Sequence, residues 1–238
     1  MKGRLDARVH ALGLAPTRSQ AESTIRLGEV RVNGRVVTKP GHFVHEHDIV
    51  KVSERERYVS RAGLKLASVA EKLSLDFRDK TVLDVGSSTG GFTDYALKHG
   101  ARRVYAVDVG TEQLHPSLRG HEQIELHEKT DIRDFTPGVT PDIVVMDVSF
   151  ISLRELLPHI AAISGPDTYI VAMVKPQFEA GRNQASKGVI KNETARRQIL
   201  KDFEAWAKGM FIIRDKADSD VAGARGNRER FYLLRKMV

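Results

Sequence analysis

The spacing of hydrophobic positions changes about a quarter of the way along the chain, and this change predicts two structural units. In the first unit Leu5, Val9 and Leu12 recur at helical spacing, and a second helical segment follows. Short β-branched segments then flank Asn33-Gly34, a dipeptide that favours a two-residue hairpin turn. These patterns predict a small α+β domain, with a charged linker at its end, over residues 1–58.

In the second unit, segments typical of buried strands alternate with amphipathic helices. Continuous apolar runs such as residues 143–146 and 169–174 are typical of strands that are buried on both faces. The repeated order of strand, helix and strand predicts an α/β fold over residues 59–238, with a doubly wound, mostly parallel sheet of seven strands whose last strand runs antiparallel. We expect strands at residues 81–85, 103–107, 123–127, 143–147, 169–174, 211–215 and 231–235, and helices at 61–75, 93–99, 153–163 and 193–208.

The composition excludes several classes of protein. The 238 residues include no cysteine, so disulfide scaffolds, thiolate zinc sites and cysteine nucleophiles are excluded. No apolar run approaches the roughly 18 residues that span a bilayer, and no apolar segment follows the charged N-terminal residues as in a signal peptide. We therefore expect a cytoplasmic monomer with no metal ion and no membrane partner.

The positive charge is unevenly distributed and indicates a polyanionic partner. The whole chain has 38 Lys or Arg against 31 Asp or Glu, and residues 1–58 hold 11 of the former and 7 of the latter. More than half of the net charge therefore lies in a quarter of the chain, which favours phosphate binding. A solvated face that keeps the protein soluble is the open alternative. Because the segment has few aromatic residues, contacts with phosphates and nucleic-acid shape fit better than base stacking.

A Gly-rich turn follows the first strand of the second unit, in the sequence VLDVGSSTGGFTD at residues 82–94. Such a strand, turn and helix presents backbone N–H groups to a ligand at the carboxyl end of the strand. The glycines match neither the dinucleotide fingerprint nor a phosphate-binding loop. Asp108 lies 22 residues beyond Gly86, where a carboxylate can accept hydrogen bonds from ribose hydroxyls. S-adenosylmethionine, with a ribose but no pyrophosphate, fits this pattern, although a dinucleotide stays open on spacing alone.

Acidic residues also follow the third strand and end the fourth. An aspartate in the position of Asp131 commonly reaches the adenine amino group in this fold, and Asp147 is expected to face the cleft where a transferred group would lie. We predict cofactor contacts from Asp84, Gly86, Ser87, Ser88, Thr89, Gly90, Gly91, Asp108, Val109, Asp131, Ile132 and Asp147.

The first unit resembles the S-four domain, a small RNA-binding module, over residues 2–52. The resemblance rests on the spacing of Arg4-Leu5-Asp6, Arg18, Asn33-Gly34 and Lys39-Pro40, among other positions. It implies that the helix pair and the hairpin present basic side chains to RNA phosphates, with Arg4, Arg18 and Lys39 as the contacts. A plain surface role for each of these side chains stays open.

The second unit resembles the FtsJ-type ribose methyltransferases, and the whole chain is similar to the TlyA family, long labelled hemolysins. The resemblance implies S-adenosylmethionine-dependent methyl transfer to a ribose 2′-OH of ribosomal RNA, with cytidine as the nucleotide and ribosomal RNA or a ribosomal subunit as the partner. The motifs that carry it are YVSRAGLKL at 58–66, DVGSSTGGFTD at 84–94, MDVSFISL at 146–153, VKPQFEAG at 174–181 and GNRERF at 226–231.

The FtsJ resemblance also implies a catalytic tetrad, Lys65, Asp147, Lys175 and Glu229. On this hypothesis Lys175 accepts the 2′-proton or orients an oxygen lone pair. Asp147 positions Lys175, and Glu229 holds Lys65. A mobile loop is expected to cover the site at residues 176–192. Further RNA contacts are predicted for Arg61, Arg133 and Arg182.

Three alternatives stay open at this point: a membrane-active hemolysin, a non-catalytic RNA-binding ribosome assembly factor, and a nicotinamide-dependent dehydrogenase. The missing membrane span and the lack of a long amphipathic surface helix argue against the first. The intact tetrad positions argue against the second. The cofactor that raises the melting temperature would separate the third from a methyltransferase.

Overall fold

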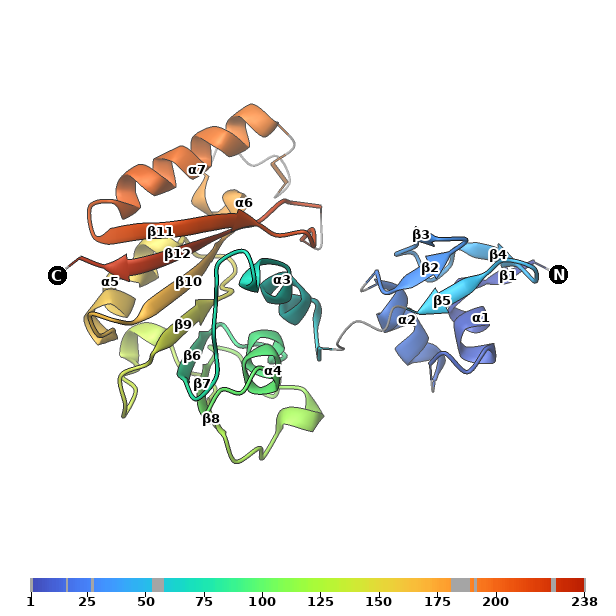
Figure 1. Ribbon diagram of the computed structural model, residues 1–238, viewed down its shortest axis with the longest axis horizontal. Helices are drawn as coiled ribbons and strands as arrows, with labels where there is room; N and C mark the ends of the chain where they lie inside the picture. The colour runs from blue at the N-terminus through green and yellow to red at the C-terminus, as the bar shows by residue number, and fades with distance from the viewer. Residues whose placement is uncertain are drawn as a thin grey trace. The chain divides into compact units, whose positions relative to one another are not determined.

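Packing contacts divide the chain into two units, Met1–Arg57 and Tyr58–Val238, and each has its own hydrophobic core (Figure 1). The computed structural model describes residues 2–15, 17–26, 28–52, 58–180, 189–190, 192–223 and 226–237. Within these residues, no helix has the length and apolar character needed to cross a membrane.

The first unit packs two helices against short strands. Its core contains the apolar positions that helical spacing predicts, with Leu5 and Val9 from α1 and Ile25 from α2 fully buried. The predicted hairpin is confirmed, because Asn33 and Gly34 adopt φ values of 50° and 81°, as a type I′ turn requires. The elements are β1 (Lys2–Arg4), α1 (Leu5–Ala11), α2 (Arg18–Arg26), β2 (Val30–Val32), β3 (Arg35–Val36), β4 (Phe43–His45) and β5 (Val50–Val52).

One strand pair of this unit was not predicted from the sequence. β1 pairs antiparallel with β4, whereas β2 lies between β3 and β5 in a separate three-stranded sheet. The sequence of β1, KGR, has no apolar or β-branched residue, so the local pattern gives no strand signal. Its extended conformation depends on backbone pairing with β4. This pairing places Arg4 where β1 ends and α1 begins.

The second unit contains a seven-stranded sheet in the order β11-β12-β10-β9-β6-β7-β8 (Figure 1). Neighbouring strands are parallel except at β12, which runs antiparallel to both β10 and β11. The predicted doubly wound, mostly parallel sheet with a reversed last strand is thus confirmed. The strands are β6 (Thr81–Val85), β7 (Arg103–Val107), β8 (Ile124–His127), β9 (Ile143–Met146), β10 (Tyr169–Val174), β11 (Phe211–Asp218) and β12 (Arg230–Lys236).

The helices of this unit occur where the periodicity predicts them, except for α6, which forms at the start of the segment 176–192, where a loop is expected. Leu157 of α5 and Phe203 of α7 are fully buried in one core with the sheet. α3 is shorter than predicted, because turn residues follow Ala70 and Ser74 adopts a positive φ of 52°. The helices are α3 (Arg61–Ala70), α4 (Gly91–Lys98), α5 (Leu153–Ile163), α6 (Pro176–Glu179) and α7 (Glu193–Ala207), with 3₁₀ turns at Pro116–Leu118 and Ile132–Asp134.

Helices α3 and α4 meet at a contact that requires glycine. A Cβ atom on Gly63 would lie 2.6 Å from Cγ of Tyr58 and 2.9 Å from the carbonyl oxygen of Gly91. Both distances are well below van der Waals contact. Gly91 is the first residue of α4, directly after the Gly-rich turn. The close packing brings Lys65 of α3 to the carboxyl end of β6, where it lines a pocket with Asp84.

Candidate active site

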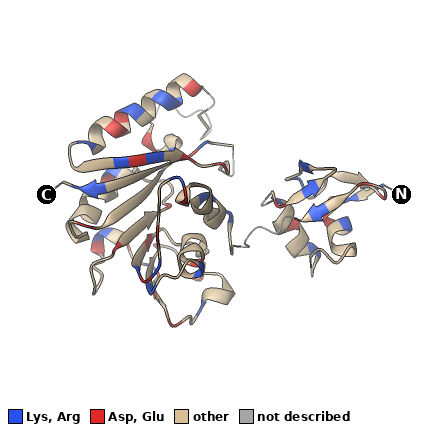
Figure 2. Cartoon of the chain, viewed as in Figure 1, with Lys and Arg blue, Asp and Glu red and all other residues tan. Residues whose placement is uncertain are grey.

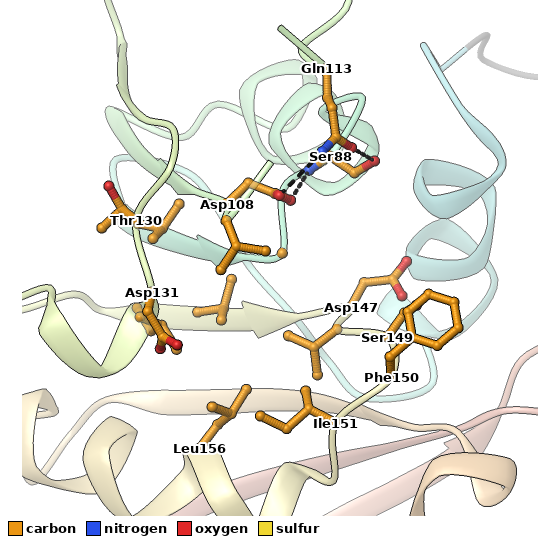
Figure 3. A pocket seen from close by; sticks show the side chains of 16 residues that line it. Ser88, Asp108, Gln113, Thr130, Asp131, Asp147, Ser149, Phe150, Ile151 and Leu156 are labelled. Carbon is orange, nitrogen blue, oxygen red and sulfur yellow. Dashed lines mark hydrogen bonds between the residues drawn. The ribbon is translucent and has the colours of Figure 1, made fainter. Parts of the chain in front are cut away.

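The strand order changes direction at the centre of the sheet, where β6 lies between β7 and β9. At such a point the loops that follow two adjacent strands leave in opposite directions and open a crevice at the carboxyl ends. Here the crevice holds a cavity of about 400 Å³ (Figure 3) and a smaller pocket of about 180 Å³. Gly86, Ser88, Asp147 and Ser149 line both spaces. The cavity and the pocket are therefore adjacent parts of one site.

Lys175 and Asp147 form an ion pair where two neighbouring strands end. Asp147 directly follows β9 and Lys175 directly follows β10, and the two strands are paired in parallel, so both side chains start from the same edge of the sheet. Lys175 Nζ lies 2.6 Å from Asp147 Oδ1 and donates a hydrogen bond of 2.7 Å to Ser149 Oγ. The Lys175 and Asp147 side chains are only 9% and 15% exposed. Two acceptors thus hold the Lys175 amine at the site.

Lys65 forms a second buried ion pair with Glu229, from a distant part of the sequence. Lys65 lies on α3 and Glu229 directly precedes β12. The Nζ–Oε2 distance is 2.6 Å, and the side chains are 11% and 4% exposed. Lys65, Asp147 and Lys175 line the smaller pocket together. The structure therefore brings the four predicted tetrad residues together, while their catalytic roles stay a prediction.

Charged side chains hold the segment that carries Glu229 in place. The sequence does not predict these contacts. Asp218 of β11 accepts hydrogen bonds of 2.6 Å from Arg196 Nη2 and 2.7 Å from Arg230 Nε. Arg196 of α7 is 4% exposed and also donates to the carbonyl oxygen of Arg228. Burial by itself raises the pKa of Asp218, but the hydrogen bonds from Arg230 and Arg196 lower this pKa to about 2. The chain is therefore anchored on both sides of Glu229.

The larger cavity has apolar walls interrupted by carboxylates (Figure 3). Asp108 accepts hydrogen bonds of 2.8 Å from Ser88 N and 2.7 Å from Gly110 N, which fix its carboxylate just beyond β7. Gln113, which the sequence analysis did not identify, lies on the same wall and accepts a hydrogen bond of 2.9 Å from Ser88 Oγ. The apolar wall consists of Val85, Val107, Val109, Ile132, Val148, Phe150, Ile151 and Leu156.

The predicted cofactor contacts are distributed over the two spaces. Gly90 and Gly91 shape the backbone, because Gly90 is the N-cap of α4 with a φ of 86° and Gly91 packs against α3. At Gly86 a Cβ would lie 3.0 Å from the carbonyl oxygen of Asp147. The larger cavity is lined by Gly86, Ser88, Asp108, Val109, Asp131, Ile132 and Asp147, and the smaller pocket by Asp84, Gly86, Ser87, Ser88, Thr89 and Asp147.

Asp84 is a buried carboxyl group with one free oxygen. Its Oδ2 accepts hydrogen bonds of 2.9 Å and 2.6 Å from the backbone N and Oγ1 of Thr93. Within the described residues, Oδ1 of Asp84 and Oγ of Ser87 have no hydrogen-bond partner. Burial raises the pKa of Asp84 to about 7, and the nearby Asp147 carboxylate adds to this effect, against the Thr93 hydrogen bonds. A free, buried carboxyl oxygen suits a cationic ligand group.

The predicted RNA contacts of this unit have other partners in the structure. Arg133 forms a salt bridge of 2.6 Å with Asp131, and its hydrogen bonds lower the pKa of this carboxylate to about 2. Arg61 donates a hydrogen bond of 2.6 Å to the carbonyl oxygen of Ala222. Arg182 lies outside the described residues, as does most of the expected loop, whose start forms α6. Among the residues that are described, no group of His, Asp and Glu side chains is suited to hold a metal ion.

In the first unit, two predicted RNA contacts share one carboxylate. Asp6 is fully buried and lies 2.7 Å from Arg4 Nη2 and 3.0 Å from Arg18 Nη2. These arginines come from the start of α1 and the start of α2, and basic residues occur on both helices and strands of the unit (Figure 2). The hydrogen bond from Arg4 is the main reason that the pKa of Asp6 lies well below its usual range. Lys39 is exposed between β3 and β4.

The second unit has a mostly parallel seven-stranded sheet with one reversed strand, and a cavity lies at the carboxyl ends of its strands. These features define a Rossmann-like fold of the methyltransferase type. The chain belongs to the FtsJ-like methyltransferase family, whose pattern matches residues 58–236, and residues 3–50 match the S4 domain. Together the two matches account for most of the chain.

Relatives match the chain over nearly its whole length. It is 38% identical to the 16S/23S rRNA (cytidine-2'-O)-methyltransferase TlyA of Mycobacterium tuberculosis, covering 98% of this chain and 90% of the relative. It is also 38% identical to Hemolysin A of Brachyspira hyodysenteriae, covering 95% and 97%. A solved structure of a candidate hemolysin from Streptococcus thermophilus has a TM-score of 0.75 at 37% identity, covering 99% and 89%. Methyltransferase and hemolysin names therefore both occur among similar proteins.

Proposed function

We propose that the protein transfers a methyl group from S-adenosylmethionine to the ribose 2′-OH of a cytidine in ribosomal RNA. One observation carries the proposal: two buried ion pairs, Lys175–Asp147 and Lys65–Glu229, each with an N–O distance of 2.6 Å, place both lysines at a pocket that shares lining residues with the larger cavity. Membership of the FtsJ-like family and the name of the M. tuberculosis relative support the choice of reaction and substrate.

The residues of the larger cavity fit S-adenosylmethionine. The fixed carboxylate of Asp108 can accept hydrogen bonds from ribose hydroxyls, and the wall around Val109 and Ile132 can hold an adenine ring. The free oxygens of Asp84 and Ser87 suit the ammonium group of the methionine part. When bound, the cofactor supplies an activated methyl group, whose C–S bond breaks with its electron pair left on sulfur as the ribose oxygen gains the methyl.

The tetrad residues prepare the ribose 2′-OH for this transfer. Lys175 accepts the 2′-proton at Nζ as the new C–O bond forms, and Asp147 holds the Lys175 amine at the pocket. Glu229 fixes Lys65 in the pocket wall, where its positive charge attracts an RNA phosphate or ribose oxygen. The ionic side chains at this pocket are 4% to 15% exposed, which strengthens their electrostatic contacts with a bound group.

Residues 1–58 are proposed to bind ribosomal RNA or a ribosomal subunit, while residues 59–238 carry out the reaction. The match to the S4 domain supports this division of roles, as does the pair of half-exposed arginines Arg4 and Arg18. Arg133, whose side chain is 49% exposed beside Asp131, and Arg61, which donates to the carbonyl oxygen of Ala222, are further candidate contacts on this proposal.

The reaction can be tested with the full chain, S-adenosylmethionine that carries a labelled methyl group, and purified small and large ribosomal subunits. We expect label on a cytidine ribose, located by mass spectrometry of nuclease fragments. Lys175→Ala should lower the rate by at least about 100-fold and leave cofactor affinity nearly unchanged in calorimetry. Lys201→Ala, at an exposed position of α7, is the matched control. Label on a base atom, or full turnover by Lys175→Ala, would overturn the proposal.

A membrane-active hemolysin is the weaker hypothesis, because all four tetrad positions are filled and paired and a relative covering 98% of the chain is named a ribosomal RNA methyltransferase. Release of dye from liposomes by the pure protein, without cofactor, would support the hemolysin instead.

A further inference from the structure

Ser149 contacts Lys175, the lysine that pairs with Asp147. Lys175 Nζ has two acceptors, Asp147 Oδ1 at 2.6 Å and Ser149 Oγ at 2.7 Å. A lysine amine that has lost its proton keeps two N–H groups and one lone pair in a tetrahedral arrangement. Two acceptors that hold the two N–H groups leave the lone pair to point in one remaining direction.

The position of Ser149 relates the direction of the Lys175 lone pair to the two spaces of the site. Ser149 lines both the larger cavity and the smaller pocket, and it bonds Lys175, which lines the smaller pocket. Figure 3 shows Ser149 close to Asp147, at the start of the loop that follows β9. The next residue, Phe150, adopts a positive φ of 68°, which side chains rarely allow. This turn leaves Phe150 92% exposed while Ser149 bonds Lys175.

We propose that Ser149 is a positioning residue that directs the Lys175 lone pair at the ribose 2′-OH. The inference rests on the proposed function, in which Lys175 accepts the 2′-proton. Asp147 alone can hold one N–H group, which leaves two positions on Nζ between which the second N–H group and the lone pair can exchange. Ser149 removes this freedom. A hydroxyl also accepts the hydrogen bond without a second negative charge, which would favour the protonated amine.

The test compares Ser149→Ala and Ser149→Thr with the wild-type full chain on ribosomal subunits. Ser149→Ala should lower kcat about 10- to 100-fold, because a misdirected lone pair loses most of the benefit of orientation. Cofactor affinity measured by calorimetry should stay within about twofold, since the other lining residues are unchanged. Ser149→Thr keeps the hydroxyl and should recover most of kcat. Ser117→Ala, at an exposed site outside both spaces, is the control.

The split between kcat and KM provides a readout that a purely structural role would not change. Because Ser149 contacts Lys175 Nζ, Ser149→Ala should lower kcat while the KM for ribosomal subunits stays within about twofold. A wild-type kcat in Ser149→Ala would overturn the inference, as would a loss of cofactor affinity equal to the loss of kcat.

Failure of this inference differs from failure of the proposed function. If the wild-type protein methylates no ribose, the proposed function fails and the role of Ser149 fails with it. If the wild-type protein methylates a ribose 2′-OH and Ser149→Ala does so equally well, only the role of Ser149 is rejected.

Discussion

Two regions of the molecule combine a buried carboxylate with cationic side chains, but they expose the cations to different degrees. In the first unit Asp6 is fully buried, while Arg4 and Arg18 remain 46% and 54% exposed. In the active site of the second unit, the two lysines that pair with carboxylates are only 9% and 11% exposed. Ion pairs of the same kind therefore lie at the surface in one unit and are buried at a pocket in the other.

The type of cation matches this difference in exposure. An arginine has five N–H donors in a planar fork, so Arg4 and Arg18 can each bond Asp6 and still present donors to solvent. A lysine has a single nitrogen, and a buried lysine can serve only a group that enters its pocket. We infer that Arg4 and Arg18 suit a polyanion that binds along the surface. The ion pairs of Lys65 and Lys175 suit a reaction at a single atom that enters the pocket.

The largest effect is expected when substitution of Glu229 breaks the buried ion pair between Lys65 and Glu229. Glu229→Gln leaves the buried charge of Lys65 without its carboxylate, so the free energy of unfolding should fall by about 3 kcal/mol. Methyl transfer should fall by about 100-fold, because Lys65 lines the pocket where the ribose enters. Denaturant titration measures the first quantity, and label transfer to ribosomal subunits measures the second.

A double variant separates stability from chemistry in this pair. Lys65→Met combined with Glu229→Leu replaces both charges with apolar side chains of similar size, so stability should return close to the wild-type value. Activity should stay low, because no cation remains at this wall of the pocket. If the double variant regained activity, the Lys65–Glu229 pair would contribute only to stability. The proposed difference in role between this buried pair and the exposed Arg4 and Arg18 would then be wrong.

The sequence could predict the Asp147–Lys175 pair more directly than the other contacts. Each residue follows an apolar run that is typical of a buried strand, and the carboxyl ends of parallel strands meet at one edge of the sheet. Lys65 and Glu229 were placed by resemblance alone. Their approach depends on the packing of α3 against α4 at Gly63, and no local pattern expresses such a contact.

Other contacts could not be predicted from the sequence, because they depend on the directions in which side chains point in the folded chain. Arg4 and Arg18 were predicted as separate RNA contacts, and only the folded chain shows that both bond one buried carboxylate. The link between Arg196 and Asp218 joins α7 to β11 over 22 residues of sequence. Side chains at such separations give no periodic signal, so these residues were missed.

The pH dependence of cofactor binding extends the comparison to Asp84, a buried carboxyl group that has no cationic partner among the residues the structure describes. The pKa of Asp84 is raised to about 7, above the unfolded value of about 4, so the folded protein holds a proton between these pH values that the unfolded chain lacks. Stability without cofactor should therefore fall as pH rises from about 4 to about 7. A cationic ligand group favours the ionised form, so cofactor affinity should rise about tenfold from pH 6 to pH 8.

Calorimetry in buffers with different ionisation enthalpies checks this linkage. We expect release of nearly one proton when S-adenosylmethionine binds at pH 6, and of almost none at pH 8. Asp84→Asn should bind more weakly, with an affinity that does not vary over this range. Proton release by the Asp84→Asn variant equal to that of the wild type would assign the titration to another group.

The smallest of these effects is expected at Asp6, where the cations are exposed. Asp6→Asn removes the charge that orients Arg4 and Arg18, and each guanidinium becomes freer to rotate. RNA affinity should fall about fivefold, or about 1 kcal/mol, and kcat at saturating RNA should stay unchanged because the active site is intact. Filter binding at several salt concentrations measures the affinity. Glu22→Gln, which removes an exposed pair with Arg26 at 3.8 Å, is the matched control.

Unfolding of the first unit at acid pH, compared with RNA binding at neutral pH, distinguishes the effect of orienting Arg4 and Arg18 from the effect of their charge. Because the pKa of Asp6 is depressed in the fold, its stabilising contribution is complete above about pH 4 and is lost as pH falls further. Asp6→Asn should therefore unfold less steeply than the wild type below pH 4, while the two bind RNA with the same number of basic side chains at pH 7. If Asp6→Asn bound RNA as tightly as the wild type, the arginines would act as independent charges, and the buried carboxylate would contribute only to folding.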